Sequence, residues 1–176
     1  TAATGMNMFQ IKENMAKAQE LYTPVKNNIK IKDAMNKDMN WVESVCKTYK
    51  PDVVVLDMGD KFVSHGSFAR QDEALKANAV HARQIAKAHG CAMFYMSQLS
   101  AEAEGKVLLN QAMMEGSRTG KAAEADVMIL IAKNPPVEGK DEDDLQRHLN
   151  VVKNKVTGWH GKIVCELDYK TARYQA

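Results

Sequence analysis

The fold class follows from the stretch Pro51-Asp52-Val53-Val54-Val55-Leu56-Asp57. Its four apolar residues form the continuous run that is typical of a strand buried on both faces of a parallel sheet. Apolar residues then recur at helical spacing from Arg70 to His89, and a second apolar run covers Cys91 to Met96. A strand, a long helix and another strand predict a right-handed βαβ unit, and therefore an α/β fold with a parallel sheet.

Helical patterns precede this unit. Residues 10–22 are rich in Ala, Lys, Glu and Gln, and Pro24 is the predicted end of that helix. Residues 39–49 place Trp41 and Val42 near one helical face before the break at Pro51.

The sequence after the unit has a different character. A third apolar run spans residues 127–132, and two prolines with an acidic run predict an exposed loop at 134–147. Residues 148–155 and 161–167 have strand-like patterns and are separated by a short turn segment, 156–160. These two segments predict a hairpin added at the edge of the sheet.

Composition bounds the class of protein. The chain has 176 residues, of which 45% are hydrophobic and 26% charged, the balance of one globular domain with a real core. The formal charge is only +2, so attraction to nucleic acid must come from local patches. Cys46, Cys91 and Cys165 are far apart and form no C-x-x-C pair, which argues against a zinc site or a disulfide framework and fits a reducing, cytoplasmic setting. The apolar runs are too short to cross a bilayer, and no leader-like segment is evident, so we expect a soluble protein that is not exported.

Polar residues follow two of the predicted strands directly. Asp57 comes after the first strand, and Gln98 comes shortly after the second. Ligands of open parallel sheets gather at the carboxyl ends of the strands. There an aspartate can stand beside the Mg²⁺ of a bound nucleotide, and a glutamine amide can reach a γ-phosphate or an attacking water. The alternative is that both side chains only cap the loops that follow.

Two lysines share one face of the first hairpin strand. Strand alternation places Lys153 and Lys155 on the same side. They are either the lysines that often protect an edge strand from pairing, or a pair of cations offered to the nucleotide of a neighbouring subunit.

The segment Gly116-Ser117-Arg118-Thr119-Gly120-Lys121 resembles a phosphate-binding loop only superficially. Such a loop needs G-x-x-x-x-G-K-[ST] directly after a strand. Here the spacer between the glycines is one residue short, Ala122 stands where the hydroxyl residue is required, and no strand precedes it. The segment is therefore read as a glycine-flanked basic loop. It either contacts a phosphate backbone or is an ordinary basic surface loop.

Taken together and in order, these elements resemble the later half of the RecA-like core of hexameric replicative helicases, the DnaB and phage primase-helicase type. The matching pieces are residues 51–57 with the following helix, 96–100, 116–126 and 153–158, and the resemblance covers about residues 40–175. It implies a three-layer fold with a mainly parallel central sheet and a carboxyl-terminal hairpin, and it implies that the phosphate-binding-loop portion is missing. It also implies a single partial domain over 1–176, divided into a helical lead-in (1–50), the Walker B and sensor strands with the DNA-loop segment (51–133), an exposed loop (134–147) and the hairpin (148–176).

The resemblance assigns roles to individual residues. Asp57 would be the Walker B carboxylate for Mg²⁺ and ATP, and Gln98 the sensor that links the nucleotide to the DNA loop. Lys153 and Lys155 would act on the next subunit's ATP. Single-stranded DNA would be held by Gly116, Ser117, Arg118 and Lys121 within a homo-oligomeric, hexameric ring, in the cytoplasm of a bacterial or phage-infected cell.

The sequence departs from the helicase pattern in two ways. Lys155 stands where these helicases usually have Arg, whose bidentate fork an ammonium does not reproduce. RecA recombinases also carry Lys-x-Lys there and are the first alternative, although they continue beyond the hairpin. In addition, the phosphate-binding loop and the catalytic Glu lie upstream in the family and are missing here, so we expect residues 1–176 to be cut from a longer protein and inactive alone. A non-catalytic RecA-like assembly module is the remaining alternative.

Overall fold

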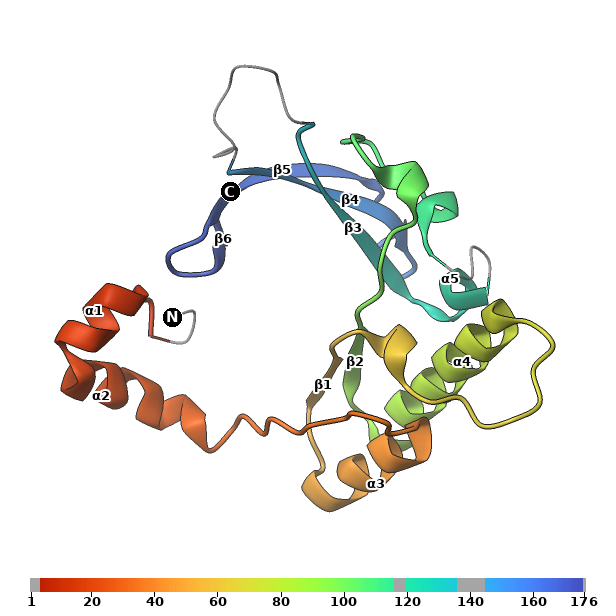
Figure 1. Cartoon of the computed structure of the whole chain (residues 1–176), viewed down its shortest axis with the longest axis horizontal. Helices are drawn as coiled ribbons and strands as arrows, with labels where there is room; N and C mark the ends of the chain where they lie inside the picture. The colour runs from red at the N-terminus through yellow and green to blue at the C-terminus, as the bar shows by residue number, and fades with distance from the viewer. Residues whose placement is uncertain (1–3, 116–119, 136–144, 176) are drawn as a thin grey trace.

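The computed structural model describes residues 4–115, 120–135 and 145–175. Within these ranges the helices are α1 (Met8–Glu13), α2 (Met15–Lys26), α3 (Met39–Tyr49), α4 (Gln71–His89) and α5 (Gly120–Glu124), with short 3₁₀ turns η1 (Gly59–Lys61), η2 (Ala101–Ala103) and η3 (Gln111–Met113). The strands are β1 (Val53–Leu56), β2 (Ala92–Tyr95), β3 (Val127–Lys133), β4 (Gln146–Asn154), β5 (Gly161–Asp168) and β6 (Arg173–Gln175). Figure 1 shows α3 and α4 beside β1 and β2, and a separate curved sheet formed by β3 to β6.

The strands form two sheets. β1 and β2 are paired in parallel, with Leu56 opposite Tyr95, and α4 connects them. β3, β4, β5 and β6 follow one another as an antiparallel meander. The mainly parallel sheet of the sequence prediction is therefore confirmed only for β1 and β2 among the described strands. The predicted hairpin exists as β4 and β5, but it lies inside the second sheet, because β3 pairs with one side of it and β6 with the other.

The first hydrophobic core lies around the parallel pair. Its buried side chains come from α3, β1, the residue after η1 and α4: Met39, Val42, Cys46, Leu56, Phe62, Ala82 and Ile85. Asp38 begins α3 by accepting a hydrogen bond from the Trp41 amide at 2.8 Å. Gly90 ends α4 in the left-handed conformation, with φ of 64°, which a residue without Cβ adopts freely. These local signals explain why the βαβ unit has nearly the predicted boundaries.

The second hydrophobic core lies under β3. Alternate residues of this strand are buried, namely Met128, Leu130 and Ala132, and they pack with side chains from the segment before α5 and from α5 itself: Leu109, Met113, Met114 and Ala122. The opposite face of β3 leaves Ile129 and Ile131 exposed. β3 therefore follows the pattern of a half-buried antiparallel strand, not of a strand covered on both faces.

The amino-terminal helix differs from the prediction. Residues 10–22 are not one helix, because Asn14 both ends α1, donating its amide to the Gln10 carbonyl, and begins α2, accepting a hydrogen bond from the Lys17 amide. Pro24 does not end α2, which continues to Lys26. Pro24 stands in the last turn, where its missing N–H removes one helical hydrogen bond and only two more helical residues follow.

None of the helices in the described ranges is both long and apolar enough to span a bilayer.

Candidate functional site

The structure brings Asp57 and Gln98 to the same edge of the parallel pair. The ladder continues past β1 and β2, since the Met96 amide donates to the Leu56 carbonyl at 3.1 Å and the Gly59 amide donates to the Met96 carbonyl at 2.8 Å. Asp57 therefore lies level with Met96, and Gln98 lies two residues further along the neighbouring chain. This juxtaposition is what the sequence pattern predicts for residues at the carboxyl ends of adjacent parallel strands.

Both side chains are available to a ligand. Asp57 and Gln98 are exposed, and neither side chain makes a hydrogen bond or ion pair with the described residues. A side chain whose purpose was to cap the next loop would bond to a nearby backbone amide, as Asp38 does at the start of α3. The loop-capping alternative is therefore not supported by the contacts of Asp57 and Gln98 in this structure.

A partly buried polar cluster lies directly beside these two residues. Asp60, Tyr95, Ser97 and Lys121 form it, and we refer to them as the Asp60 cluster. The Lys121 ammonium lies 2.9 Å from one Asp60 oxygen and donates to the Ser97 hydroxyl at 2.8 Å. Ser97 donates to the same Asp60 oxygen at 2.5 Å, and the Tyr95 hydroxyl donates to the other at 3.2 Å. Sequence reasoning did not find Asp60, Tyr95 or Ser97, because only the fold places them beside Lys121.

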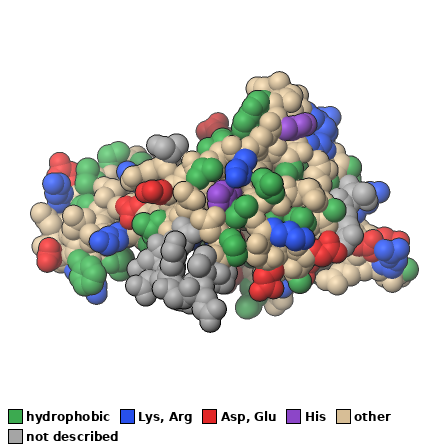
Figure 2. Space-filling model, turned by 90° about the horizontal axis from the view of Figure 1, so that it is seen from above, with side chains coloured by type: hydrophobic (Ala, Val, Ile, Leu, Met, Phe, Trp, Pro, Cys, Tyr) green, Lys and Arg blue, Asp and Glu red, His purple; other side chains and the backbone are tan. Residues whose placement is uncertain are grey.

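Lys121 is accordingly not at the surface. Its side chain is 3% exposed, so its ammonium is directed into the chain and is not presented to solvent. The other residues predicted to contact DNA, Gly116, Ser117 and Arg118, lie outside the described residues. Across the described residues in Figure 2, Lys and Arg side chains are interspersed with Asp and Glu over the face seen from above. The net charge of the chain had already indicated that no general basic surface should be expected.

Lys153, in β4, and Lys155, just after β4, have different environments. Lys153 donates to the carbonyls of Ala122 and Ala123 at the end of α5. Burial lowers the pKa of Lys153, and the nearby positive charge of Lys155 lowers it further. Lys155 itself is 47% exposed and pairs with Asp126 at 3.6 Å. An exposed pair of this kind contributes little stability, so Lys155 can leave it at small cost.

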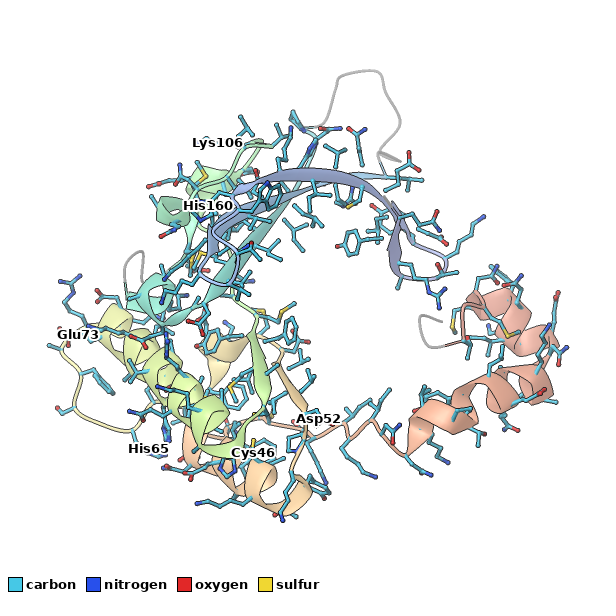
Figure 3. All side chains as sticks on the ribbon, turned by 180° about the vertical axis from the view of Figure 1, so that it is seen from behind. Cys46, Asp52, His65, Glu73, Lys106 and His160 are labelled. Carbon is cyan, nitrogen blue, oxygen red and sulfur yellow. The ribbon has the colours of Figure 1, made fainter. Side chains whose placement is uncertain are left out.

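Asp126 connects this region to α4. Arg83 of α4 contacts Asp126 at 3.2 Å and donates to the Glu124 carbonyl at 2.6 Å. Figure 3, the view from behind, labels His160 in the turn between β4 and β5 and Glu73 on α4. The contacts of Lys153 and Arg83 thus tie α5 both to the second sheet and to α4.

The residues present fit part of a site for ATP and Mg²⁺. Mg²⁺ on a nucleotide keeps several waters and is held by one or two carboxylates together with the phosphates, so a single exposed Asp57 meets the protein's share. Gln98 adds an amide at the same edge. No three or more His, Cys, Asp and Glu side chains gather as a metal cluster in the described part of the chain. The 176 residues contain no G-x-x-x-x-G-K-[ST] segment.

Comparison with solved structures identifies the fold. The chain superimposes on a solved ATPase domain with a TM-score of 0.83 at 16% sequence identity, covering 99% of this chain and 66% of that one. It also superimposes on a DnaB-like replicative helicase, studied with its interactions with primase, with a TM-score of 0.81 at 16% identity, covering 99% of this chain and 46% of that one. The chain has the fold of a DnaB-like helicase ATPase core.

The comparisons by sequence give no further assignment. No protein-family model matches the chain, and no curated protein matches it. At 16% identity the structural matches establish the shared fold, a DnaB-like RecA-type core. The chain spans about two thirds of the matched ATPase domain and less than half of the DnaB-like helicase.

Proposed function

We propose that this chain is part of an ATP-dependent replicative DNA helicase, which moves along single-stranded DNA and unwinds duplex. The observation that supports this most directly is the placement of Asp57 and Gln98, both exposed and unpaired in the described structure, at the shared carboxyl edge of β1 and β2. The fold, which is similar to that of helicase ATPase domains, supports a nucleotide site at this edge, because ligands of open parallel sheets bind at the carboxyl ends of the strands.

Each proposed residue has a distinct task. Asp57 would hold the nucleotide-bound Mg²⁺, which would supply positive charge to offset the charge of the γ-phosphoryl group during its transfer. Gln98 orients the γ-phosphate or the attacking water through its amide. Lys153 and Lys155 belong to the adjoining subunit's site, where cations stabilise the transferring group. Of these two, Lys155 has the more exposed ammonium, while Lys153 holds the end of α5 in its own chain.

The proposal also includes partners. Residues 116–118 contact the backbone of single-stranded DNA, and subunits assemble into a homo-oligomeric ring, a hexamer, so that each ATP lies between two subunits. The protein works in the cytoplasm of a bacterial or phage-infected cell. The phosphate-binding loop and the catalytic carboxylate come from sequence outside residues 1–176.

Steady-state ATP hydrolysis tests the proposal. We expect the full-length protein to hydrolyse ATP with Mg²⁺ and to be stimulated by single-stranded DNA, and residues 1–176 alone to stay at background. Asp57→Asn keeps the shape of the side chain but removes the charge that binds the metal, so we expect at least a roughly hundredfold loss of turnover, the scale typical of losing one electrostatic contact in a phosphoryl-transfer site.

A matched control separates metal binding from folding. Asp52→Asn makes the same chemical change at the amino end of β1, the opposite end of the strand (Figure 3), and should leave turnover unchanged. Equal losses in the two variants, or DNA-stimulated turnover by residues 1–176 alone, would contradict the assignment of Asp57.

One alternative is favoured by a specific feature. The Lys153-x-Lys155 spacing is also similar to RecA recombinases. Full-length protein that exchanges DNA strands but does not unwind a forked duplex would favour that reading. A full-length protein with neither activity nor nucleotide binding would favour a RecA-like assembly module.

A further inference from the structure

The turn between β4 and β5 carries an exposed tryptophan. Trp159 is 50% exposed and lies within residues 155–160, which join the two strands. Figure 3 labels His160, the next residue of this turn. A single exposed apolar side chain is common at protein surfaces and indicates nothing by itself. The order of the turn around Trp159 is the observation that distinguishes this one.

Asn154 and Thr157 hold the turn in one conformation. The Asn154 side chain accepts hydrogen bonds from the amides of Val156 and Thr157, at 3.0 and 3.1 Å, and donates to the Thr157 hydroxyl at 2.7 Å. The same hydroxyl accepts a hydrogen bond from the Trp159 amide at 3.3 Å. The Gly158 amide donates to the Asn154 carbonyl at 3.0 Å. These bonds fix the backbone of Trp159 relative to the end of β4.

The ring of Trp159 is also held in place. It lies over the backbone of Gly161, where an added Cβ atom would come within 2.6 Å of the six-membered ring. Part of the indole is therefore packed against the start of β5, and the rest faces solvent. An aromatic plane that is ordered before binding loses little conformational entropy when a flat partner stacks on it.

The position of Trp159 relates it to the proposed nucleotide site. It follows Lys155 by four residues, and four residues span at most about 14 Å when fully extended, which is comparable with the length of a nucleoside triphosphate. The Lys155 side chain is 47% exposed and pairs with Asp126 at 3.6 Å, an exposed contact that it can leave at small cost. The turn thus offers a cation and an aromatic plane close enough together to meet one nucleotide.

We propose that Trp159 stacks on the base of the nucleotide whose phosphates Lys155 contacts, in the ATP site of the adjoining subunit. This inference rests on the proposed function and adds the residue that binds the base. Phosphates are common to all nucleoside triphosphates, whereas the ring adds affinity only for a ligand that carries a flat base. The contribution of Trp159 is therefore to substrate binding, and its loss should appear in KM rather than in kcat.

The experiment measures the KM of the full-length protein for ATP and the inhibition constant of inorganic tripolyphosphate, which has phosphates but no base. We expect Trp159→Ala to raise the KM for ATP roughly tenfold through loss of one stacking contact, with kcat nearly unchanged. The inhibition constant of tripolyphosphate should not change. Trp159→Phe keeps a ring and should retain part of the affinity. Val156→Ala is the matched control, because Val156 is 76% exposed in the same turn and has no ring, and both constants should stay unchanged.

A mixture of subunits tests whether the base belongs to a neighbour's site. Asp57→Asn subunits are expected to be inactive but retain Trp159. Hydrolysis in a mixture with Trp159→Ala subunits then comes from sites whose Asp57 belongs to the Trp159→Ala subunit. We expect part of this hydrolysis to have the KM of the unmodified protein, because some of these sites receive Trp159 from an Asp57→Asn neighbour. A KM that stays raised throughout the mixture would overturn the placement of the ring in the neighbour's site.

The outcomes separate this inference from the function on which it rests. An unmodified full-length protein that neither binds nor hydrolyses ATP would contradict the proposed function and the inference with it. An active unmodified protein together with an unchanged KM in Trp159→Ala would overturn the inference alone. A parallel loss of affinity for ATP and tripolyphosphate, which a merely structural role predicts, would also overturn it. So would weaker binding of oligo(dT) at unchanged KM, which would assign the ring to DNA.

If Trp159→Ala does not fold, fluorescence replaces it. Trp41 and Trp159 are the two tryptophans of residues 1–176. Subtracting the emission of full-length Trp41→Phe/Trp159→Phe from that of Trp41→Phe therefore isolates the emission of Trp159. ATP should quench this difference signal and tripolyphosphate should not, because only a stacked base contacts the ring. Equal responses to the two ligands would overturn the inference.

Discussion

Gly59 has no room for a side chain, and this single residue controls the approach of η1 to β2. A Cβ atom built on Gly59 would lie 2.6 Å from the ring of Tyr95, far inside van der Waals contact. The Gly59 amide also extends the ladder to Met96. The glycine is needed here for close approach, and its backbone angles are not in the left-handed region. It therefore sets where Asp60 lies relative to Tyr95 and Ser97.

We expect Gly59→Ala to destabilise the protein by about 1–3 kcal/mol, the usual cost of forcing an extra group into a packed site. Urea denaturation of the variant measures this. Tyr95→Leu removes the ring, so the added methyl group should cost much less in that background. A cost that is equal in both backgrounds would show that the ring is not the obstacle.

At the scale of the element, α3 depends on Asp38. Its carboxylate accepts from the Trp41 amide at 2.8 Å and lies 2.5 Å from the His65 ring. The hydrogen bond from the Trp41 amide lowers the pKa of Asp38, and His65 lowers it further against the opposing effect of burial. Because α3 supplies Met39, Val42 and Cys46 to the first hydrophobic core, a cap that stabilises α3 also stabilises this core.

We expect Asp38→Ala to lower the free energy of unfolding by about 1 kcal/mol at neutral pH. A folded-state pKa below the unfolded value of about 3.9 means that the carboxylate's contribution is complete above that pH and is lost as the pH falls through the folded pKa. The difference between the unmodified protein and Asp38→Ala should therefore shrink on acidification. Denaturation at neutral and acidic pH measures it.

Asp38→Asn is the control, because an amide also caps a helix but does not titrate. Its advantage over Asp38→Ala should persist in acid. A difference between the unmodified protein and Asp38→Ala that is independent of pH would contradict the role given to the charge.

At the scale of the whole molecule, the proposed function requires an ATP site that is divided between subunits. Asp57 lies at the edge of the parallel pair, whereas Lys155 follows β4 in the second sheet, half exposed and paired with Asp126. In the proposed ring, each ATP site takes Asp57 from one subunit and Lys155 from its neighbour. A subunit that lacks Lys155 therefore still supplies Asp57 to a site whose other side comes from a subunit that lacks Asp57 but retains Lys155.

Mixing two inactive full-length variants tests this division. We expect Asp57→Asn and Lys155→Ala to be nearly inactive separately and to recover part of the hydrolysis when their subunits are mixed, since some interfaces then contain both wild-type residues. The control mixes two preparations of Asp57→Asn, which should recover nothing. Recovery no greater than the sum of the separate variants would contradict the action of Lys155 on a neighbour's ATP.

The sequence by itself determined the elements of the βαβ unit and the order of the candidate site. It did not determine burial, because Val53 and Val55, expected in a strand buried on both faces, are exposed. The apolar run at 53–56, the helical spacing that became α4 and the capping signals around it were sufficient, because they act between residues close in the chain. The register of one βαβ unit then places Asp57 and Gln98 at one edge without further information. The helix boundary at Asn14 was missed because competing local caps there outweighed a continuous helical composition.

Tertiary structure decided what depends on distant partners. The pairing direction of β3 and the enclosure of the hairpin between β3 and β6 follow from which strands meet, and an apolar run does not encode that. The same holds for Lys121. In the sequence it is a basic residue of a glycine-flanked loop, but Asp60 and Ser97 lie 61 and 24 residues away along the chain, and only folding brings them to its ammonium. Burial and ion pairing depend on three-dimensional neighbours. The position of a charged residue in the sequence therefore does not establish whether its charged group contacts solvent, DNA or a carboxylate.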